Sequence, residues 1–80
     1  MTLDAARESL SRANTNLGNA TRGMWRAQAL LDQAVADGDP YDIGRAEAGM
    51  NDAEQEYARS LREHAAAESA LLALAEQGEF

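Results

Sequence analysis

The chain has 80 residues and no cysteine, and its 14 acidic and 7 basic residues give a formal charge of −7. Without cysteine, neither a disulfide framework nor a thiolate metal site can stabilise so short a chain, and no apolar run approaches the roughly 18 residues that cross a membrane. Phosphate groups repel such an acidic protein, so direct binding to nucleic acid or to an anionic membrane surface is not expected.

The first half of the chain repeats a large apolar residue every seven positions, and an alanine follows each one after three residues. The large residues are Leu3, Leu10, Leu17, Met24 and Leu31, and the alanines are Ala6, Ala13, Ala20, Ala27 and Ala34. Alternating steps of three and four residues keep both rows on one side of an α-helix, as in a coiled coil. The pattern therefore predicts a helix over about residues 3–37, with Thr2 as its N-cap.

Part of this predicted helix is rich in residues that disfavour helix interiors. Between Ser9 and Gly23 they are Asn14, Thr15, Asn16, Gly18, Asn19, Thr21 and Gly23. Each costs on the order of 0.5–1 kcal/mol relative to alanine, so packing against another helix has to stabilise the segment. These small polar residues either allow another chain to approach closely or simply form a solvated face.

The six residues Asp37-Gly38-Asp39-Pro40-Tyr41-Asp42 combine the signals that end one helix and begin the next. Gly38 suits the left-handed position after a helix, Asp39 is a favourable N-cap, and Pro40 suits the first helical position. Asp42 is at the third position, where its carboxylate meets the positive end of the helix dipole. A turn at 38–39 is therefore predicted. The aspartates lack the spacing and distal glutamate of an EF-hand, so capping explains them better than calcium binding.

The second half follows the same seven-residue plan and predicts a helix over about residues 40–77. Its large row is Ile43, Met50, Tyr57, His64 and Leu71, and its small row is Ala46, Ala53, Ser60, Ala67 and Leu74. We call the corresponding sets of the first half, Leu3 to Leu31 and Ala6 to Ala34, its large row and its small row. Gly78 repeats the stop signal and leaves Glu79 and Phe80 as a tail.

So short a turn makes the two helices antiparallel. The expected fold is all-α, a coiled-coil-like antiparallel two-helix hairpin in which residues 1–80 form one domain. When residues whose numbers sum to 77 are paired, a large side chain faces a small one in every layer except Leu3 with Leu74. Such layers let the helix axes approach toward the lower end of the usual range of about 8–10 Å.

No residue pattern indicates catalysis, a cofactor or a metal, and we expect the protein not to be an enzyme. The chain has one histidine, His64, and no second histidine or cysteine to complete a metal site. We expect His64 to be partly buried between the helices and hydrogen-bonded to Ser60 or Glu68, one turn away on either side. The alternative is a pH-sensitive role, because burial would oppose its protonation.

Several large apolar residues remain outside both rows, and a two-helix hairpin has no further layer to cover them. They are Trp25, Leu30, Val35, Tyr41, Leu61 and Leu72, together with the smaller Ala65. Exposed together, they exceed the apolar patch that monomers usually tolerate, so we predict a protein-binding surface. Its residues are Trp25, Arg22, Arg26, Leu30, Leu61 and Leu72. The partner is either a foreign protein or a second copy, and a homodimeric four-helix bundle would also enlarge a marginal core.

The negative charge is concentrated in the second half of the chain. Residues 37–80 contain eleven acidic residues and three arginines, whereas residues 1–36 contain three and four. We expect Glu54, Glu56 and Glu63 to contact a basic surface on a partner protein.

These features favour a non-catalytic interaction module, a small inhibitor or adaptor. Phage anti-defence proteins, anti-CRISPR-like proteins among them, resemble the chain in size and charge. The alternative is a structural component assembled from hairpin dimers. No signal-peptide pattern begins the sequence, so the expected location is the cytoplasm of the native or host cell.

Overall fold

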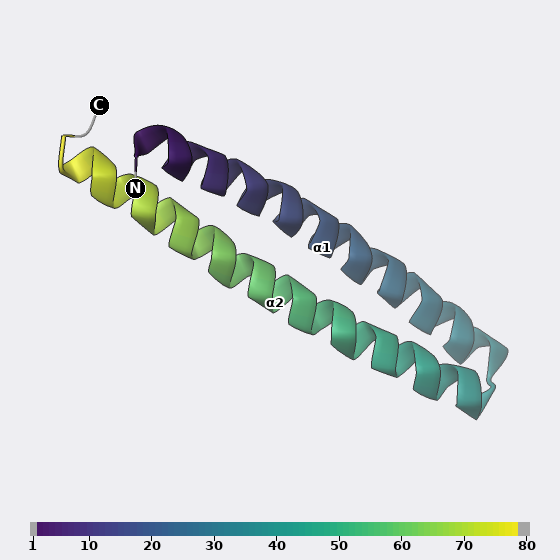
Figure 1. Cartoon of the computed structure of the whole chain (residues 1–80). Coiled ribbons are helices and arrows are strands. Elements are labelled where there is room, and N and C mark those ends of the chain that lie inside the picture. The colour runs from purple at the N-terminus through teal and green to yellow at the C-terminus, as the bar shows by residue number, and fades with distance from the viewer. Residues whose placement is uncertain (1, 79–80) are drawn as a thin grey trace.

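A computed structural model describes residues 2–78, which form two long antiparallel helices joined as a hairpin (Figure 1). Helix α1 spans Leu3–Asp37 and α2 spans Pro40–Glu76, so the predicted all-α hairpin is confirmed. The molecule is a rod of 58 × 13 × 13 Å with a radius of gyration of 17.8 Å, against about 12 Å for a compact domain of this length. The tail expected at Glu79 and Phe80 lies outside the described residues.

The helix ends carry the predicted caps. The Thr2 hydroxyl accepts a hydrogen bond from the Ala5 N–H at 3.1 Å, and the Asp39 carboxylate accepts one from the Tyr41 N–H at 2.9 Å. Between the helices, Gly38 adopts the left-handed conformation with a φ of 77°, which a residue with a Cβ adopts only at a cost. Helix α2 ends at Glu76, one residue earlier than expected.

Burial follows the two rows. The buried residues of the described chain all belong to the small row: Ala6, Ala13, Ala20, Ala34 and Ser60. Every residue of the large row is half-buried instead. The helices therefore meet through small side chains, while the large side chains flank the contact and leave one side open to solvent.

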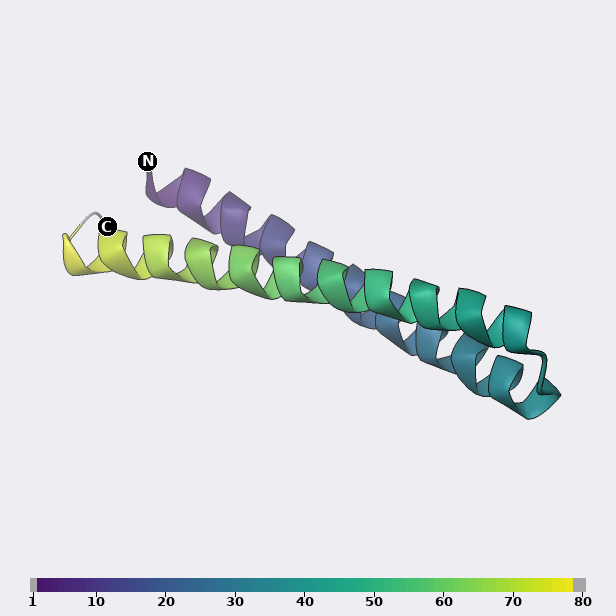
Figure 2. The same cartoon turned by 90° about the horizontal axis from the view of Figure 1, so that it is seen from below.

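The helices coil around each other, and Figure 2 shows α1 passing behind α2 in the lower view. Three grooves between the helices show which residues of α1 lie opposite which residues of α2, because each groove is lined by residues of both helices. Their small-row residues are Ala34 with Ala46, Ala20 with Ala53 and Ser60, and Ala13 with Ala67. These levels agree with the predicted register to within about one helical turn.

His64 lies between the helices, but its expected hydrogen-bond partners were wrong. Its Nε2 lies 2.6 Å from Asn14 Oδ1, across the interface, rather than beside Ser60 or Glu68 on its own helix. A large-row side chain points toward the opposite helix, so the ring reaches α1 before it can fold back along α2. Among the described residues, this is the one side-chain hydrogen bond that joins α1 to α2.

The segment from Ser9 to Gly23 remains helical despite its poor propensity. Its threonines bond to their own helix: the Thr15 hydroxyl donates to the Ser11 carbonyl at 3.2 Å and the Thr21 hydroxyl to the Leu17 carbonyl at 2.8 Å. Packing of the small and large rows against α2 offsets the unfavourable propensity, because both rows run through the segment without a break.

Candidate protein-interaction surfaces

The two rows lie toward opposite sides of the helix pair and give the rod two different faces. We name the side of the small rows the alanine face; it includes Ala13, Ala20, Ala34, Ala46, Ala53 and Ala67. The opposite side, the leucine face, includes the large rows, which are Leu3, Leu10, Leu17, Met24 and Leu31 in α1 and Ile43, Met50, Tyr57, His64 and Leu71 in α2. All three interhelical grooves are lined by small-row residues and by no large-row residue, so they open on the alanine face.

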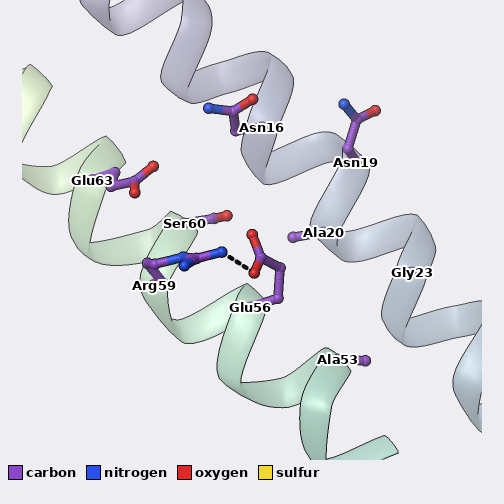
Figure 3. Close-up of a pocket in the computed structure, with 9 residues that line it drawn as sticks. All are labelled: Asn16, Asn19, Ala20, Gly23, Ala53, Glu56, Arg59, Ser60 and Glu63. Carbon is purple, nitrogen blue, oxygen red and sulfur yellow. Dashed lines mark hydrogen bonds and ion pairs between the residues drawn. The ribbon is translucent and has the colours of Figure 1, made fainter. Parts of the chain in front are cut away.

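The central groove of the alanine face, of about 440 Å³, has a floor of small side chains and mostly polar walls (Figure 3). The floor consists of Ala20, Ala53 and Ser60, and the walls are Asn16, Asn19 and Gly23 from α1 and Glu56, Arg59 and Glu63 from α2. In Figure 3 the side chains of Asn16 and Glu63 extend toward the gap from opposite helices. The groove therefore offers amide and carboxylate oxygens to a hydrogen-bond donor.

Charge in this groove is set by three side chains of α2. Arg59 donates a hydrogen bond to the Glu56 carboxylate, and this bond lowers the pKa of Glu56 below its usual value. The same bond raises the pKa of Arg59, with a smaller contribution from the charge of Glu63. One guanidinium thus lies among two carboxylates, and the cluster keeps a net negative charge.

The leucine face is apolar and open. Its large rows are half-buried, and further apolar side chains flank them. Leu61 is 43% exposed and Leu72 is 57% exposed. The two are 11 residues apart, just over three full turns, and therefore lie close to one line along α2. Trp25, 69% exposed, follows Met24 on the α1 side of the same face.

The structure separates several residues that the sequence analysis grouped together. Trp25 lies by the leucine face, while Leu30 lines the groove nearest the turn on the alanine face. Arg22 donates a hydrogen bond to Asn19 of its own helix. Arg26 is seven residues from both Asn19 and Gln33, which line grooves, and helical periodicity places it toward the alanine face.

The three glutamates predicted to contact a basic partner are also divided. Glu56 and Glu63 share the central groove, whereas Glu54 precedes Leu61 by seven residues and lies at the edge of the leucine face. Arg59 was not predicted to belong to a site, and Asn16 and Asn19 were predicted only as small polar residues of α1 rather than as groove residues. Spacing could have identified Asn16, which lies three residues after Ala13 and four before Ala20 and so shares their side of the helix. Asn19 and Arg59 directly precede Ala20 and Ser60, so this spacing rule does not find them.

Within residues 2–78, no three ligating side chains come close enough to hold a metal ion. Neither helix of that stretch combines the length and hydropathy that crossing a membrane requires. No protein-family model, curated protein or solved structure matches the chain.

Proposed function

We propose that this protein is a non-catalytic interaction module, an inhibitor or adaptor that occupies a basic surface of a partner protein. The unequal charge of the two helices carries the proposal. Helix α1 has four arginines and four acidic residues, whereas α2 has three arginines and eight acidic residues, a formal charge of −5. Because α1 is neutral and α2 is strongly acidic, the negative electrostatic potential of the rod is concentrated along α2. This potential steers a basic partner toward α2.

The central groove is the favoured contact point for such a partner. Glu63 and Asn16 offer oxygen atoms at its rim, and the alanine floor lets a long side chain lie between the helices. A lysine or arginine of the partner would place its aliphatic stem on the floor and its charge beside the carboxylates. Proteins that handle nucleic acid present surfaces of this kind, so they are the first partners to test.

The test compares charge reversals on the two helices. After a partner has been captured from the native host and purified, its affinity should fall at least about tenfold for the Glu56→Lys/Glu63→Lys double variant, because attraction becomes repulsion. Glu8→Lys/Asp32→Lys changes the net charge equally but on α1, and should retain most of the affinity. Glu54→Lys, tested alone, reports whether the edge of the leucine face also contributes. Equal loss in both double variants would contradict a site on α2.

A second candidate function is a structural component built from hairpin dimers, each dimer a four-helix bundle. The exposed leucine face favours it, because large apolar side chains on both helices are not covered by a further layer of the described structure. Assembly of this kind depends on apolar burial, so it should persist at high salt and fail in Trp25→Ala. Assembly that dissolves with added salt would contradict a dimer held together by apolar burial.

A further inference from the structure

The solvent-exposed area of the rod exceeds that expected for a monomer by about the area that one partner would cover. The chain exposes 5616 Å², whereas a folded monomer of 8.6 kDa is expected to expose about 4,700 Å². The excess of about 900 Å² is close to the roughly 800 Å² that each partner buries in a stable protein–protein interface. Within residues 2–78, no large side chain is fully buried. We propose that a second copy of this chain covers the leucine face, with the two turns at the same end of the bundle.

The choice between the faces rests on polarity. Two copies stacked through their alanine faces would bury Glu56, Arg59 and Glu63 of both subunits, a cluster with a net negative charge, which is unfavourable. On the leucine face, the large rows already have one side open, and Leu61 and Leu72 extend the apolar surface. Stacking through this face covers the large rows of α1 and α2 and completes a four-helix core.

Two face-to-face arrangements are possible, and charge distinguishes them. With the turns at opposite ends, each helix lies on its own copy, so the two acidic α2 helices meet and Glu47 approaches the level of Glu68 of the partner subunit. With the turns at the same end, α1 lies antiparallel to α2 of the partner subunit, a neutral helix on one with a charge of −5. That arrangement also brings Arg7 to the level of Glu68 of the partner subunit.

The small polar residues of α1 then acquire a role. Because a two-fold axis along the rod keeps every residue at its own level, Leu61 of the partner subunit lies between Asn14 and Gly18. A Cβ added to Gly18 would meet no atom but the Arg22 guanidinium nitrogen, at 3.9 Å, so this position is open. Glycine there lets the partner's Leu61 approach the backbone of α1, which explains why a poor helix former interrupts a long helix.

The first experiment measures molecular mass against concentration by light scattering or sedimentation. Wild type should show twice the 8.6-kDa mass of one chain. Gly18→Leu should weaken the dimer about 10- to 100-fold, because the added side chain fills the place of Leu61 of the partner subunit. Gly23→Leu is the matched control: it is also a half-buried glycine within α1, but it lines the groove of the alanine face, and its dimer should be unchanged. Leucine favours helix over glycine at both positions, so loss of the dimer would not reflect unfolding.

The second experiment tests the arrangement of the subunits. Because the chain has no cysteine, Ala36→Cys carries one spin label per subunit next to the turn. Turns at the same end place the two labels about 30 Å apart, from helix spacings of about 10 Å plus the label arms. A distance near the 58 Å length of the rod would overturn the proposed arrangement.

A monomer at all concentrations, or a Gly18→Leu dimer as tight as wild type, would overturn the inference as a whole. The inference deepens the proposed hairpin dimer and rests on it. It does not depend on the basic partner, so its failure would leave the charge-reversal experiment unaffected.

Discussion

At the scale of single residues, the hydrogen bond between His64 and Asn14 stands out because it joins two polar side chains across a contact made mainly of apolar residues. Sliding one helix by a heptad would preserve most pairs of large and small residues, but it would separate these two side chains. The bond therefore favours one register among several of similar apolar burial, a role that polar residues also have in coiled coils.

Removing this bond should cost stability in a non-additive way. Asn14→Ala should lower the free energy of unfolding by about 1 kcal/mol. His64→Leu should cost less, because leucine continues the large row and retains the apolar contact. In the His64→Leu background, Asn14→Ala should then have little further effect, as measured by urea unfolding followed by circular dichroism at one protein concentration. Additive effects of the two substitutions would contradict an interaction between them.

The Glu56–Arg59 pair should be visible in a pH titration. The carboxyl carbon of Glu56, followed by NMR, should titrate below the usual pKa of 4.5 and return toward that value in Arg59→Gln. Since the folded-state pKa is lowered, the pair stabilises the fold above the unfolded-state pKa and loses this effect as the pH falls through the folded-state pKa. An unchanged titration of Glu56 in Arg59→Gln would assign the lowered pKa to another cause.

At the scale of the helices, most of the fold could be predicted from the sequence because each feature has a local cause. The seven-residue rows determine which side of each helix is buried, and Thr2, Gly38 and Asp39 determine where the helices begin and end. The hydrogen-bond partner of His64 was predicted wrongly. This side chain can bond along its own helix or across the interface, and only its three-dimensional neighbours determine which bond forms.

The candidate surfaces were harder to predict than the helices. Trp25 and Arg26 are adjacent in the sequence, yet each residue of a helix turns by about 100°, so neighbours point in different directions. The two residues therefore lie toward different faces of the rod. The residues that line the grooves mark the alanine face. By this criterion, the predicted binding residues are divided between the leucine face and the alanine face.

The small row should tolerate no enlargement. Ala20 is buried between the helices, and Ala29, nine residues later in the same helix, is exposed. Ala20→Leu should lower the free energy of unfolding by about 1–3 kcal/mol, because the helices would have to separate. Ala29→Leu adds the same side chain toward solvent and should change stability by less than about 0.5 kcal/mol. Thermal unfolding of both variants, side by side, measures the difference, and equal melting temperatures would argue against close helix contact at Ala20.

At the scale of the whole molecule, two kinds of surface imply two opposite responses to salt. Burial of the leucine face in a dimer brings together two chains that each have a formal charge of −7, so repulsion opposes association and salt relieves it. Contact of α2 with a basic partner depends on attraction, which salt weakens.

Raising the salt concentration from about 50 to 500 mM should therefore leave the hairpin dimer as tight or tighter, while binding of the basic partner falls at least about tenfold. Analytical ultracentrifugation gives the first quantity and calorimetric titration the second, in the same buffers. A dimer that dissociates as salt is added would mean that ion pairs, rather than apolar contacts, hold the subunits together.

The hairpin turn has a practical consequence for how the rod can be attached to other things. Helix α1 begins and α2 ends at the same end, and the turn lies at the other (Figure 1). A fluorescent protein joined to either terminus would therefore be tethered at one pole, and the turn would remain accessible almost the full 58 Å away. The rod can thus be immobilised on a sensor surface by either terminus without covering the turn or the greater part of either face.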